Sequence, residues 1–186
     1  INTKVRQSII LIWGIFILSL CCIFVFFLYD VNIAGNTDRY KGLKEYLLFN
    51  DQWGTHRGYI WRIAMENYQK FPLLQKLFGY GPDTFGAITM ANNYPEMVEQ
   101  YSEIFDSVHN EYLQYLITIG PFGLLSYMAI HITAIMSVIK KKLNNPLTIG
   151  TLLAVLCYAA QATVNINQPI ATPIMWTLLA VCVASL

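Results

Sequence analysis

Charged residues are scarce in this sequence. Only 12% of its 186 residues are Asp, Glu, Lys or Arg, whereas an average soluble domain has about a quarter. Apolar residues make up 55% of the chain. This composition excludes an ordinary water-soluble domain and indicates that a lipid bilayer surrounds much of the protein.

Cysteine is also rare, and the polar middle of the chain has none. The four cysteines, Cys21, Cys22, Cys157 and Cys182, all lie in apolar runs. Their spacing fits neither a zinc site nor a redox pair. We therefore expect small buried hydrophobic residues and no disulfide in the polar region.

The apolar residues gather into four runs, and none of them alternates as a membrane barrel strand would. A transmembrane helix needs about 20 mostly apolar residues. The sequence therefore predicts an all-α, polytopic integral membrane protein with about four transmembrane helices. These predicted spans are residues 8–29, 112–139, 147–166 and 170–186.

Two details qualify these spans. The first run has no small-residue cleavage site, so we expect a permanent span and not a signal peptide. Gly120 and Pro121 lie near the start of the second run, so we expect its first turns to be bent or to lie at the membrane interface. The chain begins with Ile1, and its fourth run has no polar tail, which suggests an excerpt of a larger protein.

The placement of charge predicts the topology. Lys4, Arg6 and the lysines at 140–142 flank the spans and mark the cytoplasmic side, because cytoplasmic loops are enriched in Lys and Arg. All 11 acidic residues lie in residues 30–111. We therefore expect residues 30–111 to form one long external loop, with the polar turn at 165–169 on the same side.

Helical periodicity divides this loop. Residues 59–71 form one predicted helix, which Pro72 stops, and Pro95 opens a second amphipathic stretch whose apolar positions reach Val108. Arg57, Trp61, Ala64 and Tyr68 recur at helical spacing, so a cation shares one face with two aromatic residues. We expect the apolar stripes of both helices to pack on the spans.

A glycine-rich stretch, residues 77–85, separates these two helices. Gly79 and Gly81 allow a tight turn and the close approach of a phosphate to backbone N–H groups. The stretch matches neither a P-loop nor a dinucleotide fingerprint, so a plain structural turn is the alternative.

His109 lies where the loop runs into the second long span, followed by Asn110 and Tyr112. Histidine titrates near neutrality, and a helix N-terminus favours anions over a protonated imidazole. A neutral, basic His109 beside a phosphate is one interpretation, and a histidine that caps the helix is the other. We expect His56 to be solvated and His131 to be a satisfied polar residue within a span.

These residues together resemble the core of a known family. The ordered set resembles the O-antigen ligase and O-antigen polymerase superfamily of bacterial membrane glycosyltransferases, over roughly residues 8–140. The residues that carry the resemblance are Arg57, Trp61, Pro72, Gly79, Gly81, Phe85, His109, Asn110, Tyr112, Leu113, Gly120 and Gly123. Ligases and polymerases share this pattern, so the branch stays open.

The resemblance implies a multi-pass enzyme of the bacterial cytoplasmic (inner) membrane, with its catalytic loop on the external or periplasmic side. It implies transfer of a glycan from a lipid-linked donor, undecaprenyl diphosphate, to a glycan or lipid acceptor hydroxyl, without nucleotide sugar, metal or other cofactor. In that family the position of Arg57 contacts the diphosphate, and the position of His109 is the presumed base. The family also uses an arginine from an N-terminal half, so we expect this excerpt to be inactive alone.

The chemistry of the residues agrees with this function. A planar guanidinium suits a diphosphate leaving group, and a histidine suits activation of a hydroxyl. The aromatic residues Trp61, Tyr80 and Tyr112 can stack on sugars or pack in the interface. The predicted catalytic pair is His109 and Arg57. The predicted substrate-binding residues are Arg57, Trp61, Gly79, Gly81, Asn110 and Tyr112. We expect the protein to contact membrane lipids but no nucleic acid.

Two other classes remain as alternatives. A transporter usually carries charged residues near the bilayer midplane, whereas the four predicted spans contain none and His131 is their only titratable histidine. A membrane scaffold without catalysis is the other alternative, and it predicts that Arg57 and His109 lie far apart.

Overall fold

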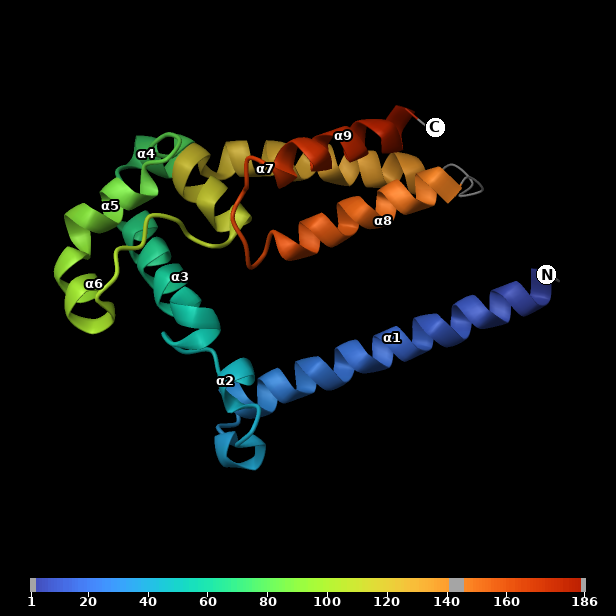
Figure 1. Cartoon of the computed structure of the whole chain (residues 1–186), viewed down its shortest axis with the longest axis horizontal. Coiled ribbons are helices and arrows are strands. Elements are labelled where there is room, and N and C mark those ends of the chain that lie inside the picture. The colour runs from blue at the N-terminus through green and yellow to red at the C-terminus, as the bar shows by residue number, and fades with distance from the viewer. Residues whose placement is uncertain (1–2, 141–145, 185–186) are drawn as a thin grey trace. The chain divides into compact units, whose positions relative to one another are not determined.

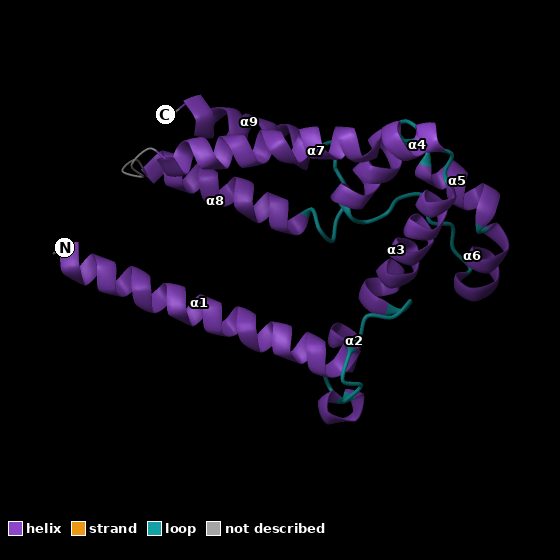
Figure 2. Ribbon diagram, turned by 180° about the vertical axis from the view of Figure 1, so that it is seen from behind, coloured by secondary structure: helices purple, strands orange, loops and turns teal. Residues whose placement is uncertain are grey.

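The computed structural model describes residues 3–140 and 146–184, and all regular structure in them is helical (Figures 1 and 2). The all-α prediction is thus confirmed for this part of the chain. Lys141, Lys142 and the last two residues of the predicted span 170–186 lie outside the described residues. The elements are α1 Thr3–Asn32, the 3-10 helix η1 Thr37–Tyr40, α2 Lys44–Leu47, α3 Trp53–Lys70, α4 Leu73–Phe78, α5 Phe85–Asn92, α6 Tyr94–Tyr101, α7 Glu111–Lys140, α8 Pro146–Gln161 and α9 Ala171–Ala184.

The chain divides into two compact units, Ile1–Tyr59 and Ile60–Leu186. In the first unit, α1 is apolar all round, and every side chain of residues 11–26 is exposed. A helix that is apolar on all faces and is not covered by protein fits a lipid environment. Leu11–Asn32 is long and apolar enough to cross a membrane, in agreement with the span predicted at residues 8–29.

Two polar residues end α1 and fix the turn that follows. The buried carboxylate of Asp30 accepts hydrogen bonds from Asn36 Nδ2 at 2.7 Å and from the Tyr40 hydroxyl at 2.8 Å. The bond to this carboxylate raises the pKa of Tyr40. Asn32 donates to the carbonyl of Leu47 and accepts from a backbone N–H just after α2, both at 2.7 Å. The two Asn32 bonds satisfy backbone groups at the end of α2.

In the second unit, α7 is broken at Gly120, whose φ of 69° and ψ of 179° lie outside the helical region. Pro121 follows, and proline is well suited to the first position of a new helix. The bend predicted from Gly120 and Pro121 is therefore confirmed. The piece after the break, residues 121–140, is about 30 Å long, which matches the hydrocarbon core of a bilayer.

Helices α8 and α9 lie beside this piece of α7 (Figure 1). Two small apolar clusters join the three helices: Ala134, Val155 and Leu179 in one, and Val138, Leu152 and Cys182 in the other. Glu111–Ile139 is the second helix long enough to cross a membrane. Helices α8 and α9 are apolar but have only 16 and 14 residues, so two spans are supported and the predicted count of four is not confirmed.

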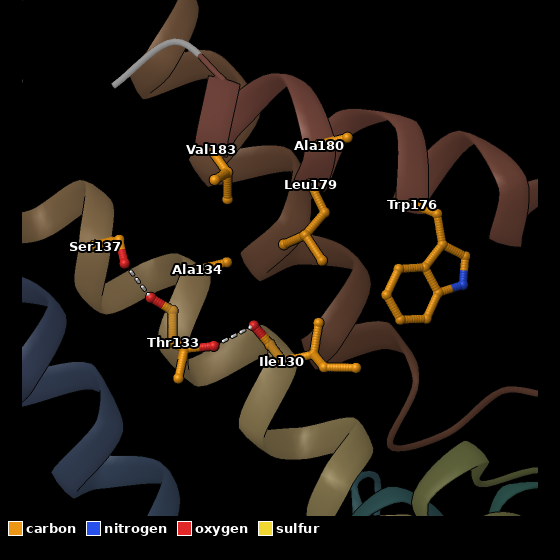
Figure 3. Close-up of a pocket in the computed structure, with 8 residues that line it drawn as sticks. All are labelled: Ile130, Thr133, Ala134, Ser137, Trp176, Leu179, Ala180 and Val183. Atoms are coloured by element: carbon orange, nitrogen blue, oxygen red, sulfur yellow. Dashed lines mark hydrogen bonds between the residues drawn. The ribbon is translucent and has the colours of Figure 1, made fainter.

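A shallow groove of about 360 Å³ lies between α7 and α9 (Figure 3). Its lining residues are Ile130, Thr133, Ala134, Ser137, Trp176, Leu179, Ala180 and Val183. The hydroxyls of Thr133 and Ser137 donate to carbonyls of their own helix, at 3.1 and 2.7 Å. The groove therefore presents a mainly apolar surface to its surroundings.

The loop between the two long helices differs in part from the prediction. Helix α3 ends at Lys70, before Pro72, as predicted, but α5 was not predicted. The second amphipathic helix is shorter than its periodicity suggests, because Ser102 adopts a left-handed conformation and ends α6 at Tyr101. Phe105 and Val108 are buried as expected, but they lie in a non-helical connector.

The cysteine expectation was correct for one residue only. Cys182 is buried, in the cluster that joins α7, α8 and α9. Cys21, Cys22 and Cys157 are exposed, because they lie on helix faces against which no protein packs in the described structure.

Candidate active site

His109 lies in the connector between α6 and α7, two residues before α7 begins. Its backbone is left-handed, with φ of 52°. A non-glycine residue costs about 1–3 kcal/mol in such a conformation, which persists only where the surrounding structure fixes it. The contacts on both sides of His109 show what fixes it here.

On the N-terminal side, Val108 is completely buried and is held by two side chains. Its N–H donates to Gln114 Oε1 at 3.0 Å, and its carbonyl accepts from the indole N–H of Trp61 at 3.0 Å. Trp61 belongs to α3, where it shares a face with buried Ala64. The tryptophan predicted to bind substrate therefore fixes the residue before His109, and sugar stacking by its ring remains a prediction.

On the C-terminal side, Asn110 is the N-cap of α7. Its Oδ1 accepts from the N–H of Leu113 at 3.0 Å, and its carbonyl accepts from the N–H of Gln114 at 2.8 Å. Asparagine is among the preferred residues at this position because it satisfies an orphan N–H of the first turn. Asn110 therefore takes the capping role that was the alternative for His109, while its predicted contact with substrate stays a prediction.

Glu111, the first residue of α7, was not predicted as a site residue. Its side chain is buried, and its carboxylate accepts from the hydroxyls of Tyr127 at 2.9 Å and Tyr158 at 3.0 Å. The N–H of Glu111 donates to the carbonyl of Ala162 at 2.8 Å. A carboxylate also fits the positive end of the helix dipole. The partners of Glu111 are distant along the chain. The only feature of the sequence that could have indicated its role is an acidic residue directly after a capping residue.

The hydroxyl of Tyr112 donates to the carbonyl of Ala159 at 2.8 Å, which adds a second bond from α7 to α8. A further chain of bonds extends from Glu111 towards α9. The Tyr158 hydroxyl lies 3.1 Å from Thr172 Oγ1, and Thr172 donates to Asn167 Oδ1. The start of α7 is therefore tied to α8 and to the turn before α9. Ring stacking of Tyr112 on substrate remains a prediction.

The predicted glycine motif forms a close backbone junction with the break in α7. Gly79 has φ of 76° and ψ of −178°, and a Cβ on it would overlap the backbone of Thr118. A Cβ on Gly120 would overlap the carbonyl of Leu77. Only glycine adopts such a backbone conformation readily. Both glycines therefore let two backbone segments touch.

The N–H groups of this motif are already used inside the protein. Gly79 N–H donates to Gln75 at 2.8 Å, Tyr80 N–H to Ile117 at 3.1 Å and Gly81 N–H to Thr118 at 2.8 Å, in each case to the carbonyl. These bonds favour the structural turn that was the alternative. Phosphate contacts of Gly79 and Gly81 remain predictions.

Arg57 belongs to the first unit and is described within it. It follows a left-handed turn in which Gly54, Thr55 and His56 have φ of 62°, 59° and 67°. One guanidinium nitrogen of Arg57 donates to the carbonyl of Gly54 at 2.7 Å, and its buried Nε has no hydrogen-bond partner among the described residues. A Cβ on Gly58 would overlap the Asn50 carbonyl. This close packing holds the arginine at the start of regular α3.

The other two histidines differ in their surroundings. His56 is half-buried within the left-handed turn, so the expected solvated loop position is not what the structure has. His131 is buried, with Nδ1 3.0 Å from the Tyr127 carbonyl and Nε2 3.3 Å from Met175 Sδ. The expectation of a satisfied polar residue in a span is confirmed for His131.

Comparison with known protein families identifies a relationship. A family model described as O-antigen ligase matches residues 3–128, which is more than half of the chain and includes both Arg57 and His109. Neither the curated proteins nor the solved structures give a match. The chain belongs to the O-antigen ligase family, and the resemblance stated from its residues is confirmed.

Proposed function

We propose that this member of the O-antigen ligase family transfers a glycan from undecaprenyl diphosphate to an acceptor hydroxyl, without a metal ion. Family membership supports the class of reaction, a glycosyltransferase of ligase or polymerase type. The position of His109 supports the chemistry, and it is the observation on which the proposal chiefly depends.

His109 acts as the general base in this proposal. A hydroxyl is a weak nucleophile, and a neutral imidazole within hydrogen-bond reach takes its proton as the oxygen attacks the anomeric carbon. The strained backbone of His109 is supported by Trp61 through Val108 and by the cap at Asn110. Such support fixes the backbone that carries the imidazole, as a positioned base requires.

Arg57 neutralises the departing diphosphate in this proposal. Its guanidinium uses one nitrogen on Gly54 and keeps a buried Nε donor without a partner among the described residues. A planar guanidinium binds phosphate oxygens through paired, charge-assisted hydrogen bonds. The proposal requires Arg57 and His109 to approach the same bound substrate, on the external face of the membrane.

The test uses the full-length enzyme with purified lipid-linked donor and acceptor. His109→Ala should lower the transfer rate by about 10²- to 10⁴-fold, the usual contribution of a positioned acid or base, while donor binding is kept. His109→Gln keeps hydrogen bonding but cannot take up a proton, so it should be equally impaired. If glutamine restores most of the activity, His109 only orients the acceptor and the general-base assignment is wrong.

The same assay separates the two branches of the family. A polymerase lengthens the lipid-linked glycan, whereas a ligase attaches it to a different acceptor. Gel analysis of product length, together with complementation of cells that lack the enzyme, distinguishes these products. If the wild-type protein yields neither product from any lipid-linked glycan, the proposed transfer is refuted.

A further inference from the structure

Helix α4, Leu73–Phe78, has an apolar surface that no described residue covers. The exposed fractions of its side chains are 74% for Leu73, 65% for Leu74 and 59% for Phe78. Three large apolar side chains exposed on one six-residue helix are costly in water. Exposed clusters of this kind mark contacts with lipid or with another protein.

The surface continues onto α7. The rings of Phe78 and Phe122 lie 5.8 Å apart, and Phe122 is itself 55% exposed. Phe122 is the second residue of the α7 piece that follows the break at Gly120. We call Leu73, Leu74, Phe78 and Phe122 the α4 patch.

The depth of the α4 patch follows from the junction that holds it. Gly79, directly after α4, touches the α7 backbone at Thr118, and Gly120 touches Leu77 of α4. Both views of the fold show α4 against α7 at its bend (Figures 1 and 2). Because residues 121–140 are about as long as the bilayer core is thick, their first turn lies at the membrane boundary. Helix α4 is therefore held at that boundary.

The polar residues around the patch suit this position. Lys76 lies on α4 itself and is half-buried, so its apolar stem can cover apolar surface while the ammonium group reaches water. Tyr80 follows α4 and is 43% exposed. Tyrosine is enriched where membrane and water meet, and a lysine at this level can extend its ammonium group to the interface.

We propose that the α4 patch inserts into the acyl chains of the adjoining membrane leaflet and so anchors the loop that carries His109 at a fixed depth. The lipid is the occupant because the patch is continuous with a bilayer-spanning helix and is fixed to it through backbone contacts. This inference depends on the span and the junction, and it is independent of the proposed transfer reaction.

The experiment places a fluorescent label on the patch in full-length protein whose native cysteines have been replaced. Leu74→Cys is labelled with bimane, and the protein is reconstituted into phosphatidylcholine vesicles with or without lipids that carry a nitroxide on the acyl chain. Glu99→Cys, at an exposed position of α6, is the matched control. We expect the nitroxide lipid to reduce the emission at position 74 at least twofold and that at position 99 little, with the reverse order for aqueous iodide.

Two results would overturn the proposal. Strong quenching by iodide at position 74 would place the patch in water. Protection from both quenchers would mean that another segment of the protein or a second copy covers the patch. Phe122→Cys gives a second, independent reading of the same surface, and it keeps the test decisive if Leu74→Cys is not produced.

Discussion

Substitution of either glycine at the junction of α4 and α7 should strongly destabilise the protein. In Gly79→Ala and Gly120→Ala, the new Cβ meets backbone atoms, which cannot rotate away as a side chain can. The strained backbone costs about 1–3 kcal/mol for a non-glycine residue, and overpacking adds about 1–3 kcal/mol. We therefore expect each variant to lose about 2–6 kcal/mol of unfolding free energy.

The measurement is the thermal unfolding midpoint of full-length protein in detergent. For a unit of 150–250 residues, each kcal/mol corresponds to about 2–4 °C, so the expected decrease is at least about 4 °C. The matched control is Gly150→Ala in α8, where no atom lies within 4 Å of the new Cβ. Alanine should be neutral or stabilising there, by up to about 1 kcal/mol.

The double variant sharpens this test. Because both glycines serve one junction, Gly79→Ala with Gly120→Ala should cost less than the sum of the single changes. If both single variants unfold at the same temperature as Gly150→Ala, the close backbone contact does not exist in the protein. The inferred depth of the α4 patch would then lose its basis as well.

Three further predictions concern the candidate site. Arg57→Lys keeps the charge but loses the planar fork, so transfer should fall roughly tenfold or more in an initial-rate assay. Arg39→Lys, whose exposed side chain pairs with the buried Asp30 carboxylate, should change transfer less than twofold. Glu111→Ala removes two charge-assisted hydrogen bonds and should lower the free energy of unfolding by about 3 kcal/mol or more. Tyr158→Phe removes only one of these bonds and should lower it clearly less. Equal thermal midpoints for the wild type and both variants would refute the role given to this carboxylate. Trp61→Phe removes the bond to the Val108 carbonyl while keeping an aromatic ring, so kcat should fall with donor KM little changed; a rise in KM alone would instead support ring stacking on the donor.

Local chemistry was enough to predict several elements. The unbroken apolar run of α1, the stop of α3 before Pro72 and the bend at Gly120 and Pro121 each depend on residues close together in the sequence. The predicted helix extends past the true end of α6. Its apolar period continues beyond Tyr101, but the left-handed Ser102 ends the helix there. An apolar period indicates which residues are buried, but not that they are helical. Phe105 and Val108 are buried in a non-helical connector.

The contacts that hold His109 could not be predicted from local patterns. Trp61 and Val108 are 47 residues apart, and so are Glu111 and Tyr158. No period or motif links such positions, since their proximity results from how α3 and α8 pack against the rest of the second unit. The sequence indicated the chemical type of His109 and Arg57, while the hydrogen bonds that position His109 became visible only in the folded chain.

These contacts extend the candidate site beyond the part of the chain that matches the family. The match ends at residue 128, yet Tyr158, Ala159 and Ala162 bond to the first two residues of α7, directly after the histidine and its cap. The start of α7, directly after His109 and its cap, is therefore held by residues beyond the matched part of the chain. A segment limited to the matched residues would leave the Glu111 carboxylate without one of its two hydroxyl donors and its N–H without its acceptor. Since unpaired buried polar groups cost about 1–3 kcal/mol each, such a segment should hold His109 less firmly than the longer chain does.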